Sequence, residues 1–425
     1  MKFELLRQTW AQLRTQRMLT VLSITGSALS IFLIMVAVIM QEVKVMPFAP
    51  ESNRDRFLHA KNGSVVRLDH EELQSNGGVS YKSALELYGK LKKPEAVTIY
   101  RSYTEACAVA VPGGQSCTAD QLCTDAEFWK VFDFSFISGK PYNKAEFDAG
   151  MPMAVITESI ARKLYGSTDA AGREMLVNYA PYRVAGVVKD VSPLADCAYA
   201  QVWVPATAGN DMENTWCGDI MGGFCATILA KSPDDFDAIH SEVDERYRQY
   251  NKELEPQGWK FVSRNRPYTQ AKNAVGSYAN VEPDEDAARL QQYIIYLVLL
   301  LVPAINLSSM TDSRLRRRMA ENGVRRAFGC TRFEMFGQLV GENLLITIAA
   351  GIIGWILSIA FAMLYGGFLF RGINSDAIPT VDVGMLVRPS IFLTAMLFCF
   401  ILNLLSSSLP AWRASRRDIV EALRK

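Results

Sequence analysis

Residues that could carry out chemistry are few and scattered in this 425-residue sequence. A phosphate-binding P-loop needs G-x4-G-K-[ST], and the nearest approach, residues 166–174, has the wrong spacing and lacks the Lys-Ser/Thr pair. A G-x-S-x-G nucleophile elbow is absent, and the three histidines, His59, His70 and His240, are scattered. We therefore expect no catalytic residue, no ATPase site and no cofactor in this chain.

Cysteine is the second residue type whose pattern is informative. Six of the eight cysteines lie in one segment: Cys107, Cys117, Cys123, Cys197, Cys217 and Cys225. An even cluster of this kind is typical of an oxidising compartment, so we expect three disulfides, with fifteen pairings open. A metal site is the alternative, but a C-x2-C motif is absent and histidines are few, so we expect no metal.

An arginine-rich segment gives the strongest local signal. Ser313 to Phe328 is predicted as a helix that ends at Gly329, and Thr331 is predicted to cap a helix that starts at Arg332. Membrane topology and anionic lipid explain the arginines in one interpretation. In the other, the segment docks a cytoplasmic protein, and the candidate coupling residues are Arg318, Glu321, Gly323, Val324, Arg325, Arg326, Ala327, Phe328 and Gly329.

These residues must be positioned by a membrane protein, because four apolar stretches stand out. They cover residues 18–40, 293–307, 339–370 and 391–409. Each is near or above the roughly 20 residues that cross a bilayer as a helix, if the short second stretch is extended at both ends. The first stretch is interpreted as an anchor, since it is longer than the apolar part of a signal peptide and no A-x-A site precedes Pro47.

Charge is balanced overall, with 45 Lys+Arg against 44 Asp+Glu, which argues against a nucleic-acid-binding protein. The basic residues nevertheless gather before the first stretch, between the second and third, and after the fourth. Because Lys and Arg resist translocation, both termini and the arginine-rich loop are predicted to be cytoplasmic. The segment from residue 41 to residue 286 is then outside.

The third stretch carries a small-residue pattern. Gly337 and Gly341 form a G-x3-G motif, and Gly351 and Gly354 add small residues on later turns. Small residues let helix backbones approach closely in a membrane, so close helix–helix contacts are expected here.

The outer segment is predicted to contain two β-α-β units. The first has strands at 65–68 and 96–100 around a helix at 81–92, and the second has strands at 226–230 and 259–262 around a helix at 233–250. Together they suggest one split α+β layer. The insertion between them has its own strands at 154–157, 182–188 and 202–205 and a helix at 158–165 ended by Gly166, typical of a small β-rich module.

At this point the residues resemble a known family, the permease subunits of type VII ABC systems (the MacB/FtsX/LolC-LolE group). Loop residues 318–331 are similar to the family's R-x-x-E-I-G-V-R-R-A-L-G-A-T signature. Residues 410–424 resemble its C-terminal P-x-x-x-A-x-x-x-D-P-x-E-A-L-R. Further similar segments are 128–134, 161–166, 182–190 and 338–354. Asn322, Cys330 and Ile419 depart from the family's pattern, which leaves the subfamily open.

The resemblance implies four transmembrane helices and a Porter-like α+β layer with a β-rich Sabre-like insertion. The expected segments are a cytoplasmic amphipathic helix 1–17, span 18–40, periplasmic domain 41–286 (41–110 and 222–286 Porter-like, 111–221 Sabre-like), span 287–309, cytoplasmic coupling loop 310–337, span 338–370, periplasmic loop 371–389, span 390–409 and cytoplasmic tail 410–425.

The resemblance also implies a mechanism. A separate cytoplasmic ATPase dimer, which binds ATP and Mg, would push the coupling loop, and two permease chains, identical or different, would transmit the motion to the periplasm (mechanotransmission). A periplasmic adaptor or outer-membrane partner and membrane lipid are the other expected partners, and the expected location is the inner membrane. The cargo would be a peptide, lipoprotein or toxic small molecule.

Two other functions compete with export. An FtsX-like membrane regulator would activate a cell-wall hydrolase, although the periplasmic domain of that branch is usually smaller. A plain receptor would have no ATPase partner, and the loop and C-terminal signatures disfavour it.

Overall fold

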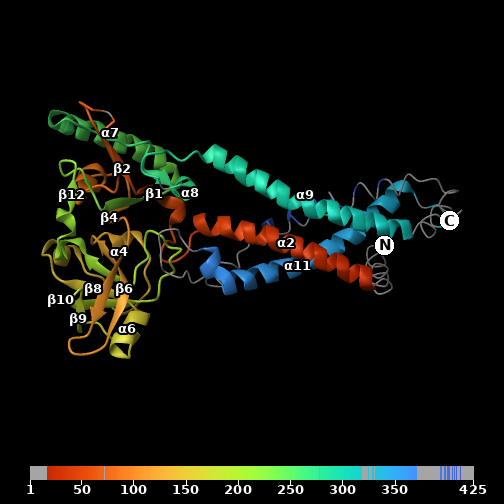
Figure 1. The fold of residues 1–425 in the computed structure, drawn as a ribbon, viewed down its shortest axis with the longest axis horizontal. Helices are drawn as coiled ribbons and strands as arrows, with labels where there is room; N and C mark the ends of the chain where they lie inside the picture. Colours follow the sequence, from red (N-terminus) through yellow and green to blue (C-terminus); the bar gives the residue numbers. More distant parts are fainter. Residues whose placement is uncertain are drawn as a thin grey trace. The chain divides into compact units, whose positions relative to one another are not determined.

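The computed structural model describes residues 17–370, except 71, 277, 318–323, 325–327 and 330. It also describes residues 393–394, 397–398, 400–402, 404, 406, 408 and 412. Two compact units divide the chain (Figure 1): an α+β domain, Lys44–Glu285, and a helical unit built from Met1–Val43 and Asp286–Lys425.

Among the described residues of the helical unit there are three long helices, α2 (Arg17–Val45), α9 (Glu285–Arg317) and α11 (Arg332–Leu369). Among the described residues two helices are long and apolar enough to cross a membrane, Ile24–Val45 and Asn343–Leu369. They correspond to the first and third predicted spans. The second predicted span lies within α9, where Gln291, Gln292 and Asn306 interrupt the apolar run. It stays a prediction, as does the fourth span, which falls largely outside the described residues.

The glycine pattern of α11 has one close contact. A Cβ on Gly354 would lie 2.7 Å from the carbonyl oxygen of Ala28, so the backbones of α11 and α2 meet at this glycine. Gly337 and Gly341 have no described atom within 4 Å of their Cβ positions. Among the described residues, the predicted close packing is therefore found at Gly354.

The α+β domain is built on one large sheet of short strands. In sheet order these are β11 (Val202–Pro205), β8 (Met153–Thr157), β10 (Ala180–Val188), β9 (Glu174–Val177), β5 (Glu105–Ala110), β6 (Ser116–Thr124), β4 (Ala96–Arg101), β14 (Phe224–Leu229), β1 (Phe57–Ala60) and β16 (Tyr268–Thr269), with β7 (Phe136–Gly139) paired to β10. A three-stranded sheet, β15 (Trp259–Val262), β2 (Gly63–Arg67) and β3 (Gln74–Gly77), and a hairpin of β12 (Thr215–Trp216) and β13 (Met221–Gly222) complete it.

Closure of part of the large sheet ties the insertion to the rest of the domain. β11 pairs in parallel with β6 and antiparallel with β8, so β6, β5, β9, β10, β8 and β11 form a closed ring. β6 also pairs with β4 at Tyr100 and Thr124. The strands of the predicted insertion therefore share a hydrogen-bonded sheet with the strands on either side of it.

The two predicted β-α-β units are confirmed as elements, but they do not form one layer. The first consists of β2, α3 (Tyr81–Ala84, continued by a π-helical turn to Gly89) and β4, and the second of β14, α7 (Phe236–Leu254) and β15. Their strands pair antiparallel as β4–β14 in the large sheet and β2–β15 in the small one. The sequence predicted one layer because the periodicity of a strand does not show which other strand it pairs with.

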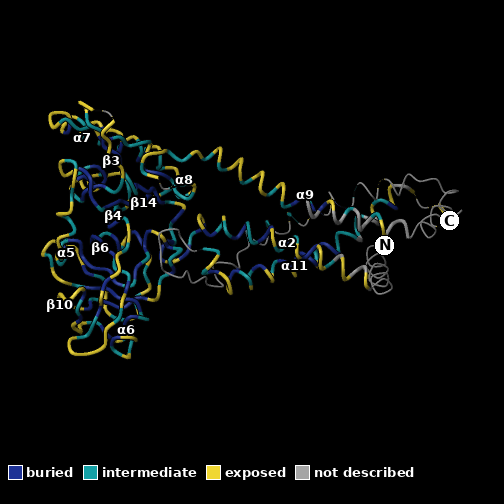
Figure 2. The backbone as a smooth tube through the Cα atoms, viewed as in Figure 1, coloured by how far each residue is buried: buried dark blue, intermediate teal, exposed yellow. Residues whose placement is uncertain are grey.

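Short helices cover the sheets. These are α4 (Phe128–Val131), α5 (Lys144–Asp148), α6 (Glu158–Tyr165) and α8 (Gln270–Val275). Gly166 ends α6 in the left-handed conformation, as predicted. Figure 2 shows the buried residues concentrated in the α+β domain, while α9 is exposed along much of its described length. The domain thus has its own continuous core.

Candidate functional site: a buried polar anchor

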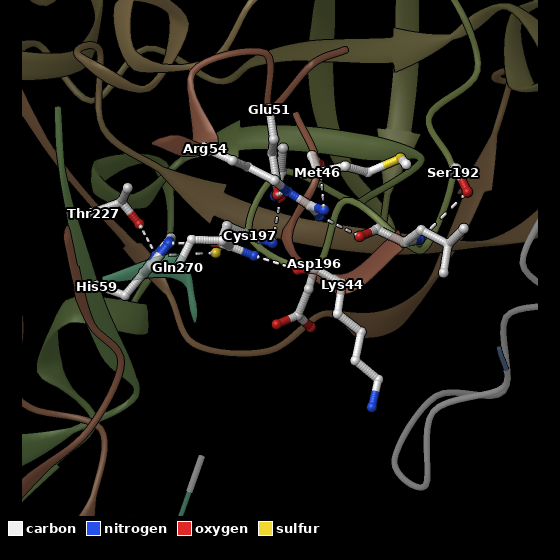
Figure 3. A network of polar contacts seen from close by, with 12 residues as sticks. Lys44, Met46, Glu51, Arg54, His59, Ser192, Asp196, Cys197, Thr227 and Gln270 are labelled. Carbon is white, nitrogen blue, oxygen red and sulfur yellow. Dashed lines mark hydrogen bonds and ion pairs between the residues drawn. The ribbon is translucent and has the colours of Figure 1, made fainter. Parts of the chain in front are cut away.

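A buried ion pair lies where α2 ends and the α+β domain begins. Arg54 and Glu51 are 2% and 1% exposed, and Arg54 Nε donates to Glu51 Oε2 at 2.7 Å (Figure 3). The guanidinium also stacks over the ring of Phe48, 4.2 Å from its centre. Two charges removed from water are tolerated only when their remaining hydrogen-bonding groups are satisfied, and here they are satisfied by backbone.

Three segments of the chain meet on this pair. Arg54 Nη1 donates to the carbonyl of Met46 at 3.1 Å, and Nη2 donates to the carbonyl of Leu194 at 2.6 Å. Glu51 Oε1 accepts the backbone N–H groups of Cys197 and Ala198, at 2.8 and 3.1 Å. The residue that follows α2 is thereby fixed to the loop between β10 and β11. We call this cluster the anchor.

A chain of hydrogen bonds leads from the anchor region to the last turn of α2. Gln270 Nε2 donates to the carbonyl of Lys44 at 2.7 Å, so Gln270 Oε1 faces His59 Nε2, also at 2.7 Å. An amide oxygen only accepts, and His59 Nε2 must therefore carry the proton. His59 Nδ1 is then an acceptor, and the Thr227 hydroxyl and the Cys197 thiol face it at 3.4 and 3.6 Å. Figure 3 shows Cys197 between the ion pair and His59.

His59 and Cys197 are the residue types of a catalytic dyad, but their environment excludes that chemistry. Burial lowers the pKa of His59 to about 3 and raises the pKa of Cys197 to about 11. The proton therefore stays on sulfur, and a thiol is not the nucleophile that a thiolate would be. Near this site the Lys61 ammonium pairs with Asp196 and lowers the pKa of that carboxyl group. The arrangement fixes the chain in place and does not activate a substrate.

A second buried arginine holds the segment that leaves the domain. Arg266 is 3% exposed, and its Nη2 donates to the carbonyls of Tyr278 and Ala279 at 3.0 and 3.2 Å. Ser64 Oγ donates to the same Ala279 carbonyl at 3.0 Å. The chain is therefore fixed by buried polar groups just after α2 and again just before α9.

The predicted coupling residues are only partly described. Arg318, Glu321, Gly323, Arg325, Arg326 and Ala327 lie outside the described residues. Val324 and Phe328 are 44% and 89% exposed, and Gly329 has a φ of +98°. Thr331 caps α11 as predicted, because its Oγ1 accepts from the N–H of Glu334 at 3.2 Å. Phe328 is thus an exposed aromatic side chain beside a helix start.

The six candidate disulfide cysteines are free thiols in the structure, and the three predicted bridges stay a prediction. Cys107, Cys123, Cys197 and Cys225 are buried, and Cys117 and Cys217 are half-buried. Three of the buried cysteines are small side chains on strands of the large sheet: Cys107 on β5, Cys123 on β6 and Cys225 on β14. Burial raises the pKa of Cys107 and of Cys225 to about 12, which makes these thiols unreactive.

Sequence reasoning missed the anchor. Glu51 and Arg54 have the i, i+3 spacing of an ordinary surface ion pair, and Gln270 lies more than 200 residues from the carbonyl that it binds. The available signal was weak: two opposite charges soon after an apolar helix. Among the described residues, no group of three or more His, Cys, Asp and Glu is arranged to hold a metal.

Two family models match the chain. The model of the MacB-like periplasmic core domain matches residues 18–246, more than half of the chain, and the model of the FtsX-like permease C-terminal region matches residues 293–419.

Individual proteins are similar at low identity. The macrolide export ATP-binding/permease protein MacB of Nitrobacter winogradskyi is 22% identical over 73% of this chain and 44% of its own length. The ABC transporter permease YknZ of Bacillus subtilis, named as uncharacterized, is 22% identical over 70% of this chain and 68% of its own. The chain thus spans less than half the length of the first of these relatives. The periplasmic region of MacB from Actinobacillus actinomycetemcomitans aligns over 48% of this chain and 88% of its own at 16% identity, with a TM-score of 0.33.

The anchor predicts a large loss of stability on replacement of Arg54 by Met. The substitution leaves the Glu51 carboxylate buried without its partner, which costs about 3–5 kcal/mol. Replacement of Arg56 by Met is the control, because the ion pair of Arg56 with Glu95 is partly exposed and is worth at most about 1 kcal/mol. Thermal unfolding of the detergent-solubilised chain, followed by tryptophan fluorescence, measures both. Equal losses would contradict the anchor.

His59 predicts a pH dependence. Burial lowers its pKa to about 3 in the fold, against about 6.5 for an unperturbed histidine. The unfolded chain therefore binds the proton first, and the stability contributed by the neutral ring is lost as the pH falls below about 6.5. Between pH 7 and pH 5 the wild type should lose about 2 kcal/mol relative to the His59→Gln variant. Unfolding at both pH values measures this, with His70→Gln, on an exposed loop, as the control. A constant difference between wild type and His59→Gln would refute the assignment.

Proposed function

The chain belongs to the family of proteins with a MacB-like periplasmic core domain, and from this premise we propose that it is the permease subunit of an ABC transporter. A separate cytoplasmic ATPase hydrolyses ATP, and the permease converts that hydrolysis into movement of the periplasmic domain. The transported molecule stays on the outer side of the membrane throughout, so the chain needs no pore of its own.

The observation that carries this proposal is the double fixation of the α+β domain. Arg54 and Gln270 hold the carbonyls of Met46 and Lys44 at the end of α2, and Arg266 holds the segment that leads to α9. These contacts support the proposal because buried polar groups hold the α+β domain's own chain at both of its ends, the ends through which mechanotransmission would act. A domain on loose linkers would absorb a displacement applied to those ends.

In this proposal the ATPase acts on the predicted cytoplasmic coupling loop, residues 310–337. Phe328 and Phe333 are 89% and 82% exposed, and exposed aromatic residues beside basic turns are the composition that protein interfaces favour. An ATPase dimer that docks on this loop and a second permease chain are the proposed partners. MacB relatives are named for macrolide export, and a toxic small molecule, a peptide or a lipoprotein is the proposed cargo here.

Charge reversal tests the docking. The double variant Arg325→Glu/Arg326→Glu should reduce stimulation of the partner ATPase on the order of tenfold, since the loss of about 1.4 kcal/mol of docking free energy at a charged interface lowers affinity about tenfold. The complex is purified from native membranes in mild detergent, its ATPase subunit is identified by mass spectrometry, and ATP hydrolysis is measured in nanodiscs.

The control carries the same change of charge elsewhere. Arg162→Glu/Arg248→Glu alters two arginines of the α+β domain that are 63% and 69% exposed, and it should leave stimulation intact. Recovery of no ATP-hydrolysing partner, or normal stimulation by the Arg325/Arg326 variant, would overturn the proposal.

A further inference from the structure

The short helix α8 contacts both ends of the polypeptide segment that forms the α+β domain. It begins where β16 leaves β1: Thr269 is opposite Leu58 and Tyr268 is opposite His59. Thr269 caps it, with Oγ1 accepting from the N–H of Lys272 at 3.3 Å. Its register is therefore set by the sheet, and its first residue, Gln270, lies next to His59.

Gln270 satisfies a carbonyl at the end of α2. The last four carbonyls of an α-helix have no partner within the helix, and Lys44 is the penultimate residue of α2. Gln270 Nε2 donates to the Lys44 carbonyl at 2.7 Å, while Oε1 is held by His59 at 2.7 Å. Both ends of the Gln270 amide are thus used, and the side chain acts as a cap contributed by a helix more than 200 residues away.

Lys272, two residues further along α8, holds the approach to α9. Its Nζ pairs with Glu282 Oε1 at 2.5 Å, and the other carboxylate oxygen of Glu282 accepts from Asn265 Nδ2 at 2.8 Å. Lys272 and Glu282 are 20% and 38% exposed, so the pair is partly shielded from solvent. Glu282 is three residues before the start of α9 at Glu285.

We propose that α8 is a brace that joins the outer end of α2 to the segment leading into α9, with Gln270 and Lys272 as its positioning residues. A displacement of the end of α2 that α8 contacts is then transmitted to the segment before α9, and a displacement of that segment is transmitted to α2. The role of the brace in transport rests on the proposed function, whereas the contacts of α8 themselves do not.

Hydrogen–deuterium exchange of the full chain in nanodiscs tests the brace. Two segments are followed, residues 41–46 and residues 278–285, with β8 as an internal reference for the folded core. Gln270→Leu removes the contact to Lys44, and Lys272→Met removes the contact to Glu282. The matched controls are Gln249→Leu and Lys252→Met on the exposed face of α7.

A brace couples the two segments in both directions. Each variant should raise exchange about five-fold in the segment whose contact it removes, the effect of one lost hydrogen bond, and about two-fold in the other segment. The controls should change neither. If Gln270→Leu affects only residues 41–46 and Lys272→Met only residues 278–285, the contacts are independent and the brace is refuted.

Two further arms keep the outcome decisive. If Gln270→Leu also raises exchange in β8, Gln270→Glu replaces it, because this variant keeps an acceptor for His59 and cannot donate to Lys44. ATP with vanadate is then added to the wild-type complex with its ATPase. If exchange in the two segments is coupled but neither segment responds to nucleotide, the proposed function is contradicted and the brace stands. If the segments exchange independently but respond to nucleotide, the brace is refuted and the proposed function stands.

Discussion

The Arg54–Glu51 ion pair, buried among backbone groups of three segments, is the interaction that fixes the chain after α2 to the α+β domain. Burial of both charges is costly, and the cost is offset only while Met46, Leu194, Cys197 and Ala198 keep their positions around them. These contacts fix Met46, the residue after α2, to the loop between β10 and β11.

Hydrogen-bonded strands connect the chain that follows α2 with the far side of the α+β domain. β1, which follows Arg54, pairs with β14, and β14 pairs with β4. β4 in turn pairs with β6, which is a member of the closed ring. A closed ring has no free edge along which strands can slip. His59, on β1, links the same strand to Gln270 and so to the end of α2. The anchor, the brace and the ring thus form one continuous hydrogen-bonded path within the α+β domain.

The sequence was sufficient for what local pattern determines. Alternating and helical periodicity located β2, β4, β8, β10, β11, α6 and α7, and the Thr331 cap and the Gly166 stop follow from short-range chemistry. It was not sufficient for what depends on distant partners. Ring closure through β6 and β11, the separation of the two β-α-β units into two sheets, and the Gln270–Lys44 contact join residues far apart in the chain. The pairing of the cysteines is undetermined for a related reason: whether a thiol is bridged or packed is decided by its neighbours in space, and those of Cys197 include His59 and the anchor loop.

The central claim is that nucleotide at the cytoplasmic end moves the periplasmic domain relative to the membrane. The most direct test attaches a donor dye at position 179, a hairpin tip where Tyr179 is 86% exposed, and places acceptor-labelled lipids in nanodiscs that hold the complete complex. Energy transfer is compared between ADP and ATP with vanadate. The account predicts a change of transfer efficiency that reverses when ADP is restored. The same efficiency in both states, in a complex that hydrolyses ATP, would contradict it.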